Sequence, residues 1–173
     1  MKVSELLKLA AEQVGYKAGK NKNNKYGQYF DSKPPKGAWQ FFNGRKNFGD
    51  WCSLLVHWLF CQLEDPAKVR KLLGEPSDPN KNCAAGVLYF WRYLRDVARR
   101  TRKNKKEGKP GDIIFFNTKM KPGHVGIIEK VTTLRYYTIE GNTGGGNGKV
   151  KRKKYLKGSS KIFGIGYYPY DKE

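Results

Sequence analysis

The sequence predicts an α+β fold, with helices first and an antiparallel sheet second. Up to about residue 102, apolar residues recur at three- and four-residue spacing, which is typical of amphipathic helices. From Pro110 onward, short runs rich in isoleucine, valine and aromatic residues are separated by turn residues, which is typical of strands. Helices followed by strands, without alternation, favour α+β over a parallel α/β sheet. The chain of 173 residues predicts one domain spanning 1–173.

The helical part divides at glycine and proline residues. We expect helices at residues 4–14, near 28–30, at 52–63, at 66–73 and, as one long helix, at 84–102. Residues 16–47 form a long loop region around the second of these helices, and long loops in compact domains are often functional. Its aromatic residues could line a cleft or pin the loop to the core: Tyr26, Tyr29, Phe30, Trp39, Phe41 and Phe42.

The second half predicts an antiparallel meander of five strands. They are expected at residues 112–117, 124–131, 136–142, 150–155 and 162–168. The glycine-rich stretch 144–148 is a flexible turn between two of them. It lacks the lysine–serine ending of a phosphate-binding loop, so we do not interpret it as one.

The formal net charge of +20 indicates an anionic partner, with nucleic acid as the usual candidate, or a lysine-rich solvated surface. No apolar run is long enough to span a membrane. The N-terminus lacks the apolar core of a signal peptide, so we expect synthesis in the cytoplasm without one. Three cysteines fit neither a disulfide framework nor a zinc site, and we expect Cys61 and Cys83 to be buried, unreactive thiols.

Cys52 stands at the start of the apolar helix expected at 52–63. Asp50 is expected to cap this helix by accepting hydrogen bonds from free N–H groups of the first turn. The positive end of the helix dipole favours the thiolate, which is the nucleophilic form of cysteine. Cys52 is therefore a candidate nucleophile.

A thiol nucleophile needs a base, and the sequence has two histidines. His57 lies five residues after Cys52, about 140° further around the same helix, so it points away from the thiol and is expected to be structural or solvated. His124 begins a strand between two glycines. Taken alone it fits a hydrogen-bonded histidine at a strand edge, but the next strand makes it the candidate base.

Glu140 and Asn142 lie two apart on that next strand and therefore share a face. A five-residue hairpin loop, 131–135, would place His124 opposite Asn142, whereas a four-residue loop would put them on opposite faces. The two meet only with an odd loop or a bulge. In that register Glu140 or Asn142 can accept the Nδ1 proton of His124 and fix its tautomer.

Together these motifs resemble the CHAP domain of the NlpC/P60 superfamily, the papain-like peptidoglycan hydrolases of phage endolysins and bacterial autolysins. The resemblance extends from about residue 6 to residue 168. Its motifs are Val14-Gly15-Tyr16, Trp51-Cys52, Pro110-Gly111-Asp112-Ile113-Ile114-Phe115-Phe116, Gly123-His124-Val125-Gly126-Ile127 and Ile139-Glu140-Gly141-Asn142. The small residue and Phe-Val that often follow the cysteine in the family are replaced here by Ser53-Leu54-Leu55-Val56.

The resemblance implies a cysteine-dependent peptidoglycan amidase, such as an N-acetylmuramoyl-L-alanine amidase, or an endopeptidase. It implies Cys52 as nucleophile, His124 as base, Glu140 as orienting residue and Asn142 as auxiliary polar group. The backbone N–H of Cys52 is expected to stabilise the oxyanion, with a second donor from residues 26–30. We expect no cofactor. Some members bind calcium before the cysteine, but the few acidic residues in that part of this chain predict no metal site.

The expected partners are peptidoglycan and anionic wall polymers, reached outside the cell, by a monomer with no specific nucleic acid partner. No separate wall-binding domain is expected, and the positive surface would take its place. One alternative is transpeptidation on the same fold. The other is a non-catalytic basic binder of nucleic acid or anionic polymer, using residues 103–106 and 149–154 with interleaved tyrosines.

Overall fold

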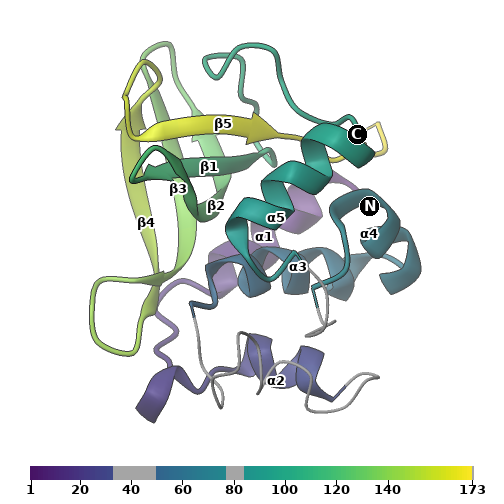
Figure 1. Cartoon of the computed structure of the whole chain (residues 1–173), viewed down its shortest axis with the longest axis vertical. Helices are drawn as coiled ribbons and strands as arrows, with labels where there is room; N and C mark the ends of the chain where they lie inside the picture. The colour runs from purple at the N-terminus through teal and green to yellow at the C-terminus, as the bar shows by residue number, and fades with distance from the viewer. Residues whose placement is uncertain (33–49, 77–83, 173) are drawn as a thin grey trace.

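Helices cover one face of a five-stranded antiparallel sheet in the computed structural model, which describes residues 1–32, 50–76 and 84–172 (Figure 1). The α-helices are α1 (Val3–Glu12), α2 (Lys25–Asp31), α3 (Cys52–Leu63), α4 (Pro66–Leu73) and α5 (Val87–Arg92). A 3-10 turn, η1 (Lys20–Lys22), precedes α2, and a π-helical turn, η3 (Tyr93–Val97), follows α5. The strands are β1 (Ile113–Thr118), β2 (Lys121–Val131), β3 (Arg135–Thr143), β4 (Lys149–Leu156) and β5 (Ile162–Gly166). The predicted α+β class is confirmed.

The helix α3 is the most buried element of the helical layer. Its buried residues surround the helix on almost every side: Cys52, Ser53, Leu54, Leu55, Val56, His57, Leu59 and Phe60. It packs against β2 and β3 on one side and against α1, α2 and α4 on the others. A helix that is apolar all round belongs in a core, so Cys52, its first residue, is held by packing on a rigid element.

Two aromatic residues of α2 pack in the core beside the start of α3. Tyr26 and Phe30 are both buried, and the Tyr26 ring stacks on that of Trp51 with centroids 5.4 Å apart. This supports the core alternative for these two residues. The predictions made for Trp39, Phe41, Phe42 and Cys83 lie outside the described residues, whereas Cys61 is only partly buried, which is less than expected.

The single long helix expected at 84–102 is wrong. The α-helix ends at Arg92, continues as the π-helical turn, and stops before Arg99, whose φ is +55°. Beyond it the backbone joins the edge of the sheet, where Arg102 N donates to the Ile165 carbonyl at 2.9 Å and Tyr167 N donates to the Arg100 carbonyl at 3.0 Å. Hydrogen bonding to β5 outweighs the local helical pattern.

The predicted meander is correct for β1 to β4 but wrong for β5. The strand order is β4-β3-β2-β1-β5, so the last strand returns to pair with β1, and Phe115 lies opposite Gly164. In Figure 1, β5 and β1 run across the view while β4 runs along it, which shows how strongly the sheet twists. The strands carry buried apolar residues on both faces of the sheet. The core away from the helices consists of Ile114, Phe116, Ile128, Tyr136, Ile162 and Ile165.

A bulge at Glu129 sets the register between β2 and β3. At the hairpin end Val131 pairs with Tyr136, which leaves four residues in the turn. Past the bulge, Ile128 pairs with Thr138 and Ile127 with Ile139. The structure therefore combines an even turn with a bulge, the second of the two arrangements that bring His124 and Glu140 onto one face.

Candidate active site

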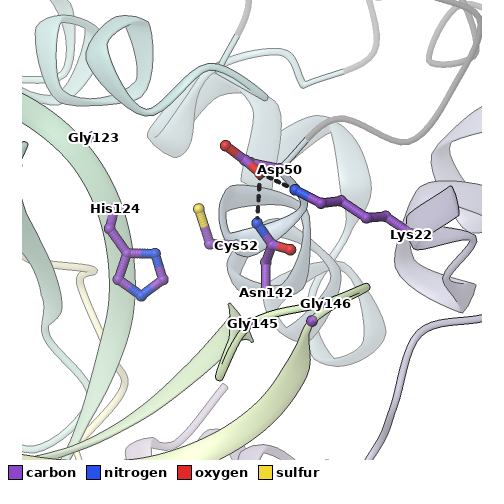
Figure 2. A pocket seen from close by; sticks show the side chains of 9 residues that line it. Lys22, Asp50, Cys52, Gly123, His124, Asn142, Gly145 and Gly146 are labelled. Atoms are coloured by element: carbon purple, nitrogen blue, oxygen red, sulfur yellow. Dashed lines mark hydrogen bonds and ion pairs between the residues drawn. The ribbon is translucent and has the colours of Figure 1, made fainter.

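A pocket of about 250 Å³ opens at the N-terminus of α3. Figure 2 shows Cys52 between His124 on one side and a cluster of Asp50, Lys22 and Asn142 on the other. Three glycines of the turn between β3 and β4 close the remaining wall. The full lining is Lys22, Asp50, Cys52, Gly123, His124, Asn142, Gly145, Gly146 and Gly148.

Cys52 is fixed by the residue before it. Trp51 is fully buried, its Nε1 donates to the Asn147 carbonyl at 3.2 Å, and Leu55 N donates to the Trp51 carbonyl at 3.1 Å. Trp51 also fills the space beside Gly141, where an added Cβ would lie 2.7 Å from the Trp51 ring. Packing of Trp51 against β3 therefore fixes the position of Cys52, of which 1% is exposed.

Asp50 does not cap α3, contrary to the prediction. The N-cap position is Trp51, and the Asp50 carboxylate turns into the pocket instead. Its Oδ1 accepts from Lys22 Nζ at 2.5 Å and from Asn142 Nδ2 at 2.8 Å. Partial desolvation would raise the pKa of Asp50, but these two hydrogen bonds outweigh it and lower that pKa. The carboxylate thus links η1 to the end of β3.

His124 is bound by Glu140 through Nε2, at 2.8 Å from Glu140 Oε2. We expected Nδ1 to make this contact, so the ring is turned the other way. The nitrogen that faces the Cys52 sulfur in Figure 2 is therefore Nδ1. Burial by itself would lower the pKa of His124, but hydrogen bonds to Cys52 and Glu140 outweigh it and raise the pKa to about 10. The ring is held as an imidazolium at neutral pH.

Glu140 is fully buried and still charged. Burial alone would raise the pKa of Glu140, but the bond to His124 and that from Thr138, whose Oγ1 donates to Oε1 at 2.6 Å, lower it. Lys153 Nζ lies 3.3 Å from Oε2. The missing side chain of Gly126 leaves room for this carboxylate, because a Cβ there would lie 2.7 Å from Glu140 Cγ.

Asn142 lies in the pocket but does not bond to His124. Its φ is +51°, in the left-handed region, at the irregularity between Glu140 and Thr143. This turns the side chain away from the face that Glu140 shares with His124 and toward Asp50. The alternation of a regular strand, which predicted a shared face for Glu140 and Asn142, does not hold at this bulge.

His57 is away from the pocket, as its helical position predicts. It is fully buried and its ring contacts that of Phe90, with centroids 4.4 Å apart. Desolvation lowers the pKa of His57 to about 3, and the nearby Ala84 carbonyl opposes this only partly. The residue is a neutral part of the core.

Sequence reasoning missed two cations of the site, Lys22 and Lys153. Nothing near Lys22 distinguishes it from the other lysines of its loop. Lys153 had a usable signal, since alternation along β4 places it opposite Thr138, on the face that also carries Glu140. Across residues 1–32, 50–76 and 84–172, no group of three or more His, Cys, Asp or Glu side chains could hold a metal ion.

Comparisons with known proteins bear on the fold and the family. A search of curated proteins finds no match. A solved structure titled "The crystal structure of Ly7917" is similar, with a TM-score of 0.55 and 17% sequence identity, over 96% of this chain and 62% of that one. At this identity the similarity shows the fold, which is consistent with a papain-like architecture. The chain spans less than two thirds of that structure.

The CHAP domain family model matches residues 43–142, a stretch that contains Cys52, His124, Glu140 and Asn142. This confirms the resemblance inferred from the sequence. Because the match extends over more than half of the chain, the protein belongs to the CHAP domain family, whose members are in general peptidoglycan hydrolases.

Proposed function

We propose that the protein cleaves an amide bond of peptidoglycan by a thiol mechanism that uses Cys52, His124 and Glu140. The observation that carries the proposal is the position of His124, between the Cys52 sulfur and the buried Glu140 carboxylate at 2.8 Å (Figure 2). A nucleophile, a base and a group that orients the base are the parts that acyl transfer needs.

In the first half of the reaction the Cys52 thiolate attacks the carbonyl carbon of the amide. A carbon–sulfur bond forms, and the backbone N–H of Cys52, at the positive end of α3, stabilises the oxyanion. His124 Nδ1–H then donates its proton to the leaving amine as the carbon–nitrogen bond breaks. Glu140 keeps the ring in place through Nε2 during this transfer.

In the second half the neutral His124 takes a proton from water, and the resulting hydroxide attacks the thioester carbonyl. The carbon–sulfur bond breaks, which releases the carboxylic acid and restores the thiolate and the imidazolium. The same residue thus acts as acid in one step and as base in the next.

The second oxyanion donor expected from residues 26–30 is absent from the described lining of the pocket. Tyr26 is buried against Trp51, whereas Lys22, from the turn before α2, reaches the pocket. Besides His124, Lys22 and Asn142 are the side chains with N–H donors among the described residues that line the pocket. We propose them as binding groups for the substrate carbonyl and its neighbours.

We propose peptidoglycan as the substrate, at the bacterial cell wall outside the cell. The net charge of +20 would hold the enzyme near wall polymers that carry phosphates and carboxylates. This attraction is screened by salt, so binding to walls should weaken as ionic strength rises while the chemical step is unchanged.

The test is the loss of turbidity of purified cell walls with native protein, Cys52→Ala and Cys61→Ala. Cys61→Ala removes another thiol of the same helix and is the matched control. We expect lysis by native protein and Cys61→Ala only. Equal lysis by Cys52→Ala, or no lysis by native protein on any of several wall types, would contradict the proposal.

Analysis of the reaction products distinguishes endopeptidase, amidase and transpeptidase activity. New amino termini within the peptides indicate an endopeptidase, and release of the glycan from the first alanine of the stem indicates an amidase. Joined peptides in place of free carboxylates would indicate transpeptidation. Tight, salt-sensitive binding of DNA without lysis would favour the non-catalytic binder.

A further inference from the structure

An exposed patch at the end of the sheet away from the pocket combines leucines with cations. Leu134 is 67% exposed and Leu156 is 55% exposed, two of the four large hydrophobic residues exposed in the described part of the chain. Lys157 N donates to the Leu134 carbonyl at 3.0 Å, so the two leucines lie on adjacent chain segments. Single exposed apolar residues need no explanation, but neighbouring ones do.

The cations beside these leucines share one face of the sheet. Arg135 pairs with Leu156, and in the next row Tyr137 pairs with both Lys130 and Lys154. Directly paired residues share a face, and so do residues two apart on a strand. This is also the face on which the helices pack nearer the pocket, because Ile139, two residues beyond Tyr137, belongs to the helix-side core. We name six residues the leucine–lysine face: Lys130, Arg135, Tyr137, Lys154 and Leu156 on this face of the sheet, with Leu134 in the turn at its end.

The acidic residue next to Lys130 in the chain is already neutralised. Glu129 forms a two-pronged ion pair with Arg152, with Nε and Nη2 at 2.8 to 3.0 Å from its oxygens. Lys130 Nζ lies 5.8 Å from the centroid of the Tyr137 ring. The leucine–lysine face thus presents three cations, a tyrosine and Leu156, with Leu134 exposed in the adjoining turn.

We propose that the leucine–lysine face docks on the surface of an anionic phospholipid membrane. Lysine and arginine near such a surface are attracted by its negative potential. Leucine and tyrosine side chains enter the boundary between headgroups and acyl chains, where amphipathic surfaces bind. A wholly hydrophilic polyanion offers the cations a partner but leaves the leucines in water. The leucines therefore favour the lipid over nucleic acid or a phosphate polymer.

Docking would be peripheral. No helix in the described ranges is long and apolar enough to cross a membrane. The strand β3 runs from Arg135, in the docking face, to Thr143, beside the pocket, which is a length of roughly 25 Å. Figure 1 shows the turn between β3 and β4 at the opposite end of these strands from the turn between β2 and β3. A docked molecule would turn its thiol pocket away from the lipid.

The test is flotation with vesicles of phosphatidylcholine containing 30% phosphatidylglycerol, roughly the charge density at which such attraction acts. The full chain is compared with Leu134→Ser/Leu156→Ser and with Met120→Ser. Met120 is 94% exposed in the turn between β1 and β2, at the other end of the sheet, and is the matched control. We expect the bound fraction of the double variant to fall about tenfold or more, and that of Met120→Ser to stay at the native value.

Three outcomes would overturn the proposal. The first is that the native chain fails to float with anionic vesicles, and the second is that both variants float as the native chain does. The third is equal binding to phosphatidylcholine alone. Loss of vesicle binding in a Lys130→Ser/Lys154→Ser variant, with polyglycerol phosphate binding unchanged, would support the lipid. Circular dichroism shows that each variant is folded, and lysis of membrane-free walls tests the thiol chemistry separately.

Discussion

Lys153 Nζ lies 3.3 Å from Glu140 Oε2, the same oxygen that lies 2.8 Å from His124 Nε2. The carboxylate is therefore shared between a ring and an ammonium group. Because Lys153 lowers the pKa of Glu140, it also draws negative charge away from His124. This makes Lys153 a positioning residue for a histidine that it does not touch.

Replacing Lys153 by methionine should strengthen the pairing between Glu140 and His124. We expect the pKa of His124 to rise and the alkaline limit of wall lysis to move upward by up to about one pH unit. Lys154→Met is the control, because Lys154 pairs with Tyr137 on the opposite face of the sheet. The measurement is the initial lysis rate against pH. The same displacement in both variants, or in neither, would contradict the role of Lys153.

The raised pKa of His124 predicts an unusually wide range of activity on the alkaline side. An ordinary histidine loses its proton around pH 6.5. With a pKa of about 10, the His124 ring keeps its proton well above that pH and loses it only as the pH rises through about 10. Lysis should therefore persist to about pH 9. Glu140→Gln keeps an acceptor for Nε2 but removes the charge, so the alkaline limit should move down by about one to three pH units.

NMR titration of the His124 ring checks the assignment of that limit, because it reads the protonation state directly. If the ring of the native protein titrates near 6.5, or if Glu140→Gln leaves the titration unchanged, the charge pairing is not what holds the proton. The pairing of His124 with Glu140 also contributes to the free energy of unfolding, because the folded protein holds the proton more tightly than the unfolded chain does. This contribution is present below pH 6.5 and lost as the pH rises through about 10.

His57 predicts the behaviour of the fold in acid. Its pKa is about 3 in the folded protein and about 6.5 in the unfolded chain, so the unfolded chain binds the extra proton. Stability should therefore fall as the pH drops from about 6.5 to about 3, by up to about 5 kcal/mol for this residue. His57→Leu should flatten this part of the profile, as measured by urea unfolding at several pH values.

Lys68→Met is a useful comparison for the urea experiment. Lys68 pairs with Glu64 on the exposed side of α4, so its loss should change stability little and leave the acid slope in place. An acid slope in His57→Leu as steep as that of the native protein would show that other groups cause it.

The sequence was most informative where local signals and packing agree. The ends of α4 were predicted to the residue, because Pro66 stands at the first helical position and Asp65 caps it by accepting from Lys68 N at 2.9 Å. The ends of α3 were predicted equally well. The cap of α3 was not, because Asp50 finds stronger partners in Lys22 and Asn142, which are far away in the sequence.

The features that the sequence did not predict depend on contacts between residues far apart in the chain. The return of β5 to β1 and the early end of α5 both depend on pairing across the sheet edge, which leaves no local pattern. Cys52, His124 and Asn142 were identified and do line the pocket, whereas Lys22 was missed. The ring nitrogen of His124 that meets Glu140 was not predicted either, because it depends on the side-chain rotamer. The catalytic roles of Cys52, His124, Glu140 and Asn142, and the single domain over 1–173, remain predictions.

The extra residue in β2 has a consequence for how this hairpin can change length. If the bulge were lost while Glu129 stayed in the strand, the register of the hairpin end would continue along the strands, and Glu140 would lie opposite Ile127, among the apolar side chains beneath the helices. Changes of length within the turn leave the paired residues and their faces as they are, whereas one residue inserted or deleted between His124 and Ile128 should turn His124 to the other face of the sheet. Among related sequences, the turn between the two strands should therefore vary in length more than the stretch from His124 to the bulge.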